Sequence, residues 1–313
     1  MAASAQGRGA MVGIAFKVTS VLVFLVMSSL LKASPDIPAG ELVFFRSFFG
    51  IFPVVLFLAS TGQLRDGLKS NNVASQVWRG LVGTLSMAGS FTALTRLPLP
   101  EAVTINYATP LLIVVLSALF LHERVRLYRW SAVIVGLVGV VVIAWPQLTL
   151  FSGGGIGTGA TLGVLAAFAG ASFGAVAQLL VRQLIKTERS ATIVLYFLVS
   201  SSVISLVTVP FGWVMPTPLE AALLVGAGFA GGIAQVLLTE SYRHADMSVV
   251  APFEYTSLVF SVIIGFMFFG DVPTWFTLVG GLIVVGSGLF IIYREHRLGL
   301  DRRRVREVVT PQG

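Results

Sequence analysis

The chain has 313 residues, of which 56% are hydrophobic and only 11% are charged. Soluble globular proteins carry about 25% charged residues, so this composition excludes a soluble protein and predicts that lipid covers most of the surface. The net charge of +7 does not indicate a nucleic-acid partner, because most basic residues fall in short loops and the C-terminal tail, where they set membrane orientation. The absence of cysteine excludes disulfides and thiolate chemistry.

Ten long apolar segments follow one another along the chain. A helix rises about 1.5 Å per residue, so about 20 apolar residues cross a hydrocarbon core of about 30 Å. We interpret the first segment as a membrane helix rather than a signal peptide, because its apolar run from Met11 to Leu31 is too long for a signal core. We therefore predict an all-α polytopic membrane protein with ten transmembrane helices at residues 12–34, 40–61, 73–95, 100–121, 127–146, 157–182, 190–211, 218–241, 248–270 and 273–293.

The hydropathy pattern occurs twice. The stretch from Ala93 to Ile143 is faintly repeated from Glu240 to Phe290, and the order of segments and loops agrees better than the individual residues do. Each half has five segments, an odd number, so the second half crosses the membrane in the opposite direction to the first. This predicts two inverted repeats of five helices. Inverted repeats are a common plan of membrane transporters.

This repeat divides the chain into three regions. We expect a first repeat at residues 12–146, a second repeat at residues 157–293 and a basic cytoplasmic tail at residues 294–313. The run Gly153-Gly154-Gly155 is the expected joint between the halves.

The distribution of lysine and arginine predicts the orientation, because cytoplasmic loops carry an excess of both. If the N-terminus lies in the cytoplasm, the opposite side holds only Lys32 and Arg96. Lys17, Arg46 and Arg79 lie within segments, and every other basic residue lies on the cytoplasmic side. Both termini are therefore expected in the cytoplasm.

Two ionisable residues inside apolar segments are candidates for function, since a charge there costs roughly 2.5–3.5 kcal/mol on insertion scales. Arg46 either snorkels or caps a helix end, or it faces an aqueous cavity and meets an anionic or polar substrate. Glu254 follows Pro252, which can unwind the first turn of its helix. It is either an acid favoured by a helix N-terminus or a substrate or proton site. Tyr107 occupies the position of Glu254 in the first repeat.

Uncharged polar residues within apolar runs either bond between helices or line a cavity, and Asn106, Gln178 and Gln235 belong to this group. Lys17 and Arg79 lie nearer the cytoplasmic ends, where we expect snorkelling or pairing with loops. The predicted substrate-binding residues or transport path are Arg46, Asn106, Tyr107, Gln178, Gln235, Glu254 and Tyr255.

No catalytic constellation is present in the sequence. The histidines have no metal-ligand spacing, and there is no H-E-x-x-H, G-x-S-x-G or phosphate-binding P-loop motif. We therefore expect no enzyme activity, no metal, no cofactor and no nucleotide-driven pump. An intramembrane enzyme would need acids, histidines or serines clustered at one depth, and a scaffold without transport activity is a further alternative.

The ten helices in two halves resemble the drug/metabolite transporter superfamily, and specifically its EamA-type domains. The resemblance covers nearly the whole chain and rests on Phe44-Phe45-Arg46, on Pro110, on Leu121-His122-Glu123-Arg124 followed by Trp130, and on Phe269-Gly270-Asp271 followed by Trp275. It implies a small-molecule substrate, a central cavity between the halves, and alternating access in the inner membrane.

The stretch from Ala251 to Tyr255 resembles the matching segment of S-adenosylmethionine uptake carriers and bacterial riboflavin transporters, which often carry a basic residue where this chain has Glu254. We predict uptake of riboflavin or a similar aromatic cofactor precursor, since the 23 phenylalanines offer rings that stack on a flat substrate. The alternatives are export of amino acids or other metabolites, or transport of S-adenosylmethionine. The sequence does not reveal the direction of transport, the coupling ion or the oligomeric state.

Overall fold

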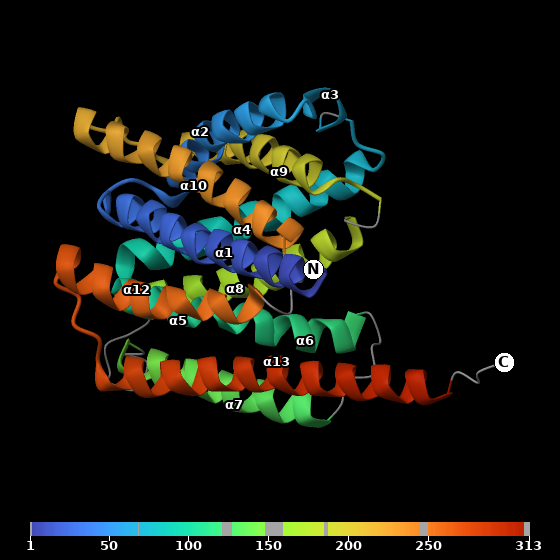
Figure 1. Cartoon of the computed structure of the whole chain (residues 1–313). Helices are drawn as coiled ribbons and strands as arrows, with labels where there is room; N and C mark the ends of the chain where they lie inside the picture. Colours follow the sequence, from blue (N-terminus) through green and yellow to red (C-terminus); the bar gives the residue numbers. More distant parts are fainter. Residues whose placement is uncertain are drawn as a thin grey trace.

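Figure 1 shows the computed structural model of the chain, a bundle of long helices that run roughly side by side. It describes residues 2–67, 69–120, 127–147, 159–184, 187–244 and 250–309, and these contain no strand. The α-helices are α1 (Ala2–Lys32), α2 (Ala39–Ser60), α3 (Leu64–Gly67), α4 (Val73–Arg96), α5 (Leu99–Asn106), α6 (Ala108–Phe120), α7 (Leu127–Ala144), α8 (Gly159–Leu184), α9 (Ser190–Ser205), α10 (Pro218–His244), α12 (Thr256–Ile264) and α13 (Trp275–Val309). The 3-10 helices are η1 (Trp145–Gln147), η3 (Leu206–Phe211) and η4 (Ala251–Tyr255), and η5 (Gly265–Phe269) is a π-helix.

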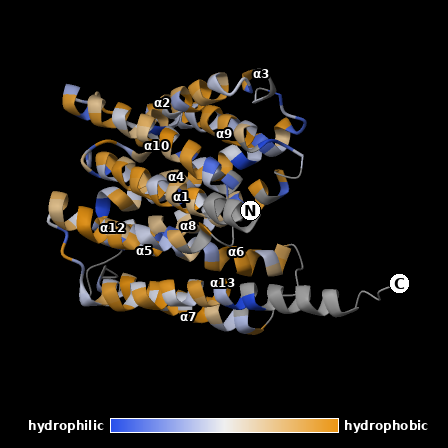
Figure 2. Ribbon diagram, viewed as in Figure 1, coloured by the Kyte–Doolittle hydropathy of each residue, from blue (hydrophilic) through white to orange (hydrophobic). Residues whose placement is uncertain are grey.

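Many of these helices are long and apolar enough to cross a membrane. Seven such spans occur among the described residues: Met11–Lys32, Ala39–Ser60, Leu99–Phe120, Gly159–Val181, Ala191–Phe211, Pro218–Ser241 and Trp275–Arg294. Two shorter apolar helical stretches cover Trp130–Ala144 and Phe253–Phe269. Between 33% and 44% of the most apolar 18-residue window of each long span is buried. Figure 2 shows that hydrophobic residues, in orange, dominate the helices. The chain is therefore an all-α, multi-pass membrane protein.

Many predicted segments agree closely with observed helices, but the described residues give seven long apolar spans and two shorter ones, so the predicted count of ten is not confirmed. The second prediction, 40–61, is displaced by one residue from α2, and the third, 73–95, differs from α4 by one residue at its end. Two helices are longer than predicted, because α1 already begins at Ala2 and α13 continues to Val309 through most of the predicted tail. The expected joint at Gly153–Gly155 lies outside the described residues.

Two predicted segments are interrupted rather than continuous. Tyr107 separates α5 from α6, and the segment that begins at Ala251 starts as the 3-10 helix η4 before it becomes α12. Pro252 occupies the first turn of η4, which agrees with the prediction that it unwinds the start of this segment. Both interruptions fall next to predicted transport residues.

The helices pack in a small number of close pairs. Helix α1 lies against α10, α4 against α8, α2 against α10 and α9, and α7 against α13. In Figure 1, α7 and α13 form one side of the bundle and α2, α9 and α10 form the opposite side. The main buried core lies between them and includes Leu31, Leu42, Leu99 and Ala108, none of which is measurably exposed. This core surrounds the residues that form the candidate site.

Candidate functional site

A cavity of about 270 Å³ lies between α1, α2, α4 and α5. Its wall includes two predicted transport residues, Arg46 and Asn106, and two aromatic residues, Phe24 and Phe91. The other lining residues are Met27, Ser28, Ser86, Met87, Ser90, Leu94, Ala102 and Val103. All of these belong to the first predicted half, whereas the resemblance implied a cavity between the halves.

Arg46 is the charged group in this wall. Its side chain is 5% exposed, and its Nε and Nη1 atoms have no hydrogen-bond partner among the described residues. The neighbouring acid on the same helix, Glu41, accepts a hydrogen bond from the backbone N–H of Val214 at 3.1 Å instead. The guanidinium carbon of Arg46 lies 5.7 Å from the ring centre of Phe197 on α9. In the part of the chain that the structure describes, this cation is thus enclosed without an acidic partner.

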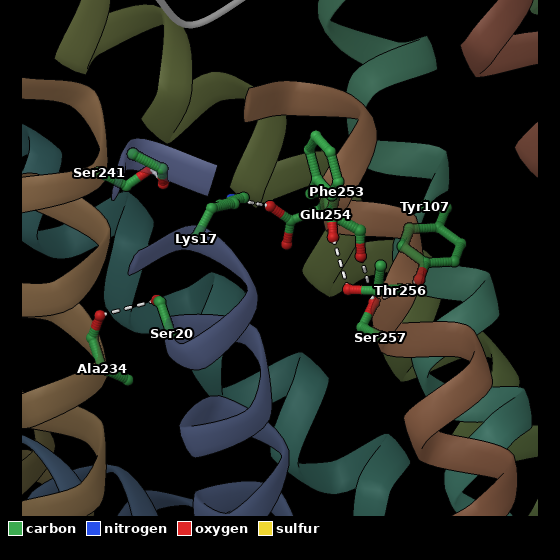
Figure 3. Close-up of polar contacts among 10 residues, drawn as sticks. Lys17, Ser20, Tyr107, Ala234, Ser241, Phe253, Glu254, Thr256 and Ser257 are labelled. Atoms are coloured by element: carbon green, nitrogen blue, oxygen red, sulfur yellow. Dashed lines mark hydrogen bonds and ion pairs between the residues drawn. The ribbon is translucent and has the colours of Figure 1, made fainter. Parts of the chain in front are cut away.

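Figure 3 shows that Glu254 lies beside Lys17, near the middle of α1. Its carboxylate forms an ion pair with Lys17, which joins α1 to η4. Lys17 is 2% exposed and Glu254 is 52% exposed, so a buried cation meets a carboxylate that is still open on one side. One turn away, the Ser20 hydroxyl donates to the carbonyl of Ala234 at 2.8 Å.

This ion pair corrects the sequence prediction for Lys17. We expected this lysine to snorkel or to pair with a loop, but it is buried and its partner belongs to another membrane segment. The sequence did show a lysine inside one apolar segment and an acid inside another apolar segment, which could have indicated an ion pair. Sequence reasoning did not match the two because 237 residues separate them.

The two predicted tyrosines come together beside this ion pair. The rings of Tyr107 and Tyr255 meet edge to face with their centres 5.2 Å apart. The hydroxyl of Tyr107 is hydrogen-bonded to the hydroxyl of Ser257, which also bonds the carbonyl oxygen of Glu254 at 2.7 Å. Figure 3 shows this chain of contacts. The interrupted segments of both predicted halves are therefore tied to each other.

The two predicted glutamines lie elsewhere. Gln178 is exposed on α8. Gln235 on α10 borders a second, much smaller cavity against α2 and α9, together with Val54 and Ala191. Neither glutamine lines the cavity that contains Arg46.

A second ion pair lies at the C-terminal end of α1, and the sequence did not single it out. The ammonium group of Lys32 lies 3.5 Å from a carboxylate oxygen of Asp271 and donates to the carbonyl of Leu97 at 2.6 Å. The same carboxylate accepts the backbone N–H of Leu99 at 2.8 Å. Lys32 also lies over the ring of Phe269, 5.3 Å from its centre. The motif Phe269-Gly270-Asp271 was recognised, but its partner on α1 was not.

Among the described residues, no group of three or more histidines and acids is arranged to hold a metal ion.

Comparisons with known proteins identify relatives of this chain. Residues 7–145 and 161–293 each match the EamA-like transporter family. A pseudopaline exporter of Pseudomonas aeruginosa is 33% identical over 87% of this chain and 93% of its own length. An S-adenosylmethionine uptake transporter of Rickettsia bellii is 30% identical over 82% of this chain and 84% of its own. A riboflavin transporter of Rhizobium johnstonii is 29% identical over 91% of this chain and 89% of its own.

One solved crystal structure has the same fold. It superposes with a TM-score of 0.63 and covers 91% of this chain and 98% of its own, at 22% sequence identity. This similarity concerns the fold alone. The family and the names of the relatives indicate a transporter rather than an enzyme.

Proposed function

Because the chain belongs to the EamA-like transporter family of the drug/metabolite transporter superfamily, we propose that it is a secondary carrier that works by alternating access. Its substrate is a small molecule that enters the cavity between α1, α2, α4 and α5. The carrier lies in the inner membrane with both termini in the cytoplasm, as the distribution of basic residues predicts.

The observation that carries this proposal is the buried guanidinium group of Arg46 in the cavity wall. A charge inside a membrane protein is costly unless it has a partner, and such residues mark substrate and ion pathways. Arg46 has no acidic partner among the described residues, so we assign its partner to the transported molecule.

We further propose that the carrier consists of two inverted halves of five helices, residues 12–146 and 157–293. In this arrangement α8 is the counterpart of α1, and α10 is the counterpart of α4. The close pairing of α1 with α10 therefore has its equivalent in the pairing of α8 with α4. The interruptions at Tyr107 and at η4 also occur in the fourth segment of each half, as is typical of discontinuous transporter helices.

The finer substrate prediction, uptake of riboflavin or a similar cofactor precursor, has two supports. Riboflavin transporters of Rhizobium johnstonii and Vibrio cholerae are 29% and 26% identical to this chain. Phe24 and Phe91 also place aromatic rings in the cavity wall, where a flat ring system stacks favourably. The alternative of export is supported by the similarity to a pseudopaline exporter, and transport of S-adenosylmethionine by the Rickettsia relatives.

Transport into proteoliposomes tests these proposals. Purified protein would be reconstituted with labelled riboflavin or labelled S-adenosylmethionine on one side, with and without a pH gradient. We expect saturable transport of at least one labelled compound, reduced at least tenfold in Arg46→Gln. If Arg46→Gln transports as fast as the unchanged chain, Arg46 does not contact the substrate. Exchange measured from each side separately decides between uptake and export.

A further inference from the structure

A second arginine extends the candidate site away from the cavity. Arg79 on α4 places its guanidinium carbon 3.7 Å from the ring centre of Phe197, the same ring that Arg46 approaches from α2. Both positive charges therefore lie against one aromatic ring. Like Arg46, Arg79 has buried Nε and Nη1 atoms without a hydrogen-bond partner among the described residues. We call Arg46 and Arg79 the arginine pair.

The packing around the arginine pair leaves space for both guanidinium groups. A Cβ atom at Gly83 would lie 2.7 Å from Nη1 of Arg79 and 2.6 Å from the ring of Phe197. A Cβ atom at Gly231 on α10 would lie 3.3 Å from Nε of Arg46. A side chain at Gly83, on the same helix as Arg79, would crowd Arg79, and one at Gly231 would crowd Met27 and Arg46, so glycine at these positions leaves room for the guanidinium groups.

Further polar atoms near the arginine pair lack partners. Gln76 lies one turn before Arg79 on α4 and is fully buried, and neither its Nε2 nor its Oε1 has a hydrogen-bond partner among the described residues. An amide buried in this way is as unusual as an unpaired cation, because buried polar groups are normally hydrogen-bonded. The region between α2, α4 and α9 thus holds several buried donors without acceptors.

The missing partner must be an anion. Two like charges taken out of water repel each other, and one shared aromatic ring does not offset the desolvation of both. A guanidinium group presents a planar fork of donors that matches the two oxygens of a carboxylate. Arg46 lies in the cavity wall and Arg79 does not, but both guanidinium groups approach the same ring of Phe197, so we expect a carboxylate that reaches Arg46 from the cavity to approach Arg79 as well.

We propose that Arg46 and Arg79 form a subsite that binds a carboxylate group of the transported molecule. This inference rests on the proposed function, and it specifies the substrate class as a small organic acid or zwitterion. It also assigns a role to Arg79, which the sequence placed with the snorkelling residues. Riboflavin carries no carboxylate, so the subsite favours the other substrate classes over a neutral ring system.

Binding of succinate to the purified full-length chain in detergent tests the subsite without any transport step. Thermal unfolding would be followed against succinate concentration at constant ionic strength, with inorganic phosphate as a second probe. We expect succinate to raise the unfolding temperature of the unchanged chain. Its apparent affinity should fall at least tenfold in Arg46→Gln and in Arg79→Gln, and less in Arg79→Lys, which keeps the charge but not the fork. Arg96→Gln is the matched control, because this exposed arginine lies on the same helix, α4.

A purely structural role for Arg79 predicts a different result. If the arginine pair lacks a partner in the free protein, Arg79→Gln removes a repulsion and unfolds at the same or a higher temperature without succinate. If Arg79 instead holds the helices together, the same variant unfolds at a clearly lower temperature, and the proposal is wrong. Wild-type succinate affinity in Arg79→Gln would also overturn it, as would stabilisation by phosphate alone.

The outcomes separate this inference from the proposed function. Transport that is unchanged in Arg79→Gln would contradict the subsite and leave the carrier function intact. Succinate binding that requires both arginines, together with no transport of any labelled compound, would support the subsite and contradict the carrier function.

Discussion

The two ends of the stretch of α1 from Lys17 to Lys32 are fastened in different ways. At one end, Lys32 contacts Asp271, the carbonyl of Leu97 and the ring of Phe269, while Asp271 also holds the N–H of Leu99. At the other end, Lys17 pairs with Glu254, whose carboxylate is half exposed. We call these the Lys32 end and the Lys17 end.

The difference indicates which end separates more easily. Lys32 and Asp271 are 13% and 16% exposed, so water does little to replace their contacts when they part. Water already reaches Glu254 and compensates part of the loss when it leaves Lys17. Alternating access requires each end to open in turn, and we expect the Lys17 end to open at the lower cost in free energy. Four predictions test this comparison.

The largest effect is expected for Asp271→Ala. The variant leaves Lys32 without its carboxylate and the N–H of Leu99 without its acceptor, so the folded state should lose about 3 kcal/mol. Thermal unfolding in detergent measures this loss. Asp271→Asn is the control, because its side-chain oxygen still accepts from Leu99 and the loss should be smaller. Equal unfolding temperatures for the alanine variant and the unchanged chain would contradict the picture of a firmly fastened Lys32 end.

A smaller but directional effect is expected for Glu254→Gln. A loss of about 1.4 kcal/mol at the Lys17 end raises the open fraction about tenfold. The chain has no cysteine, so single cysteines report local opening without further changes. A cysteine in place of the buried Ser20 should react with a water-soluble maleimide about tenfold faster in Glu254→Gln. A cysteine in place of the buried Ser34, beyond the Lys32 end, should react at an unchanged rate.

Charge reversal is the control for this second prediction. Lys17→Glu places two acids against each other, and adding Glu254→Lys should restore part of the original labelling rate at position 20. Faster labelling at both reporter positions in Glu254→Gln would mean that the change loosens the whole bundle rather than one end.

A third prediction concerns the aromatic contact at the Lys32 end. Phe269→Leu keeps the apolar contact but removes the ring face below the ammonium group, which should cost about 1 kcal/mol. Labelling of a cysteine at position 34 should rise several-fold, and a cysteine at position 20 serves as the unaffected reference. A faster labelling rate at position 20 alone would show that Phe269 does not stabilise the Lys32 end.

The smallest effect is expected for Tyr107→Phe. This change removes the hydroxyl that is hydrogen-bonded to Ser257, and Ser257 keeps its bond to the carbonyl of Glu254. The expected loss is about 0.5–1 kcal/mol, visible as a small drop in unfolding temperature. Ser257→Ala should lower the unfolding temperature further, because it leaves the buried hydroxyl of Tyr107 without this partner. A much larger drop for Tyr107→Phe than for Ser257→Ala would show that the phenol contacts something other than this serine.

The positions of the helices could be predicted from the sequence because bilayer thickness fixes their length and lipid fixes their composition. The apolar run around Arg46 thus predicted α2 to within one residue. The break at η4 was also predictable, since Pro252 removes a backbone donor there. Both features depend only on residues close to one another in the chain.

The partners of the buried charges could not be predicted in the same way. Lys17 and Glu254 are 237 residues apart, and their contact depends on how the segments are arranged around one another. Phe197, which lies under both guanidinium groups of the arginine pair, is one of 23 phenylalanines, and nothing in its local sequence distinguishes it. Arg79 looked like a residue near a helix end because the sequence does not show which helices surround it.

One feature of α1 has a consequence for leakage across the membrane. Lys17 and Lys32 project from a single helix with neither glycine nor proline between them, and they are separated by roughly 22 Å. If α1 tilts as a unit about a point between the two lysines, we expect a movement that draws one lysine away from its acid to press the other toward its own. Simultaneous opening would require both ion pairs to break within one rigid element. We therefore expect solutes and ions to meet a closed barrier at every stage of the proposed transport cycle.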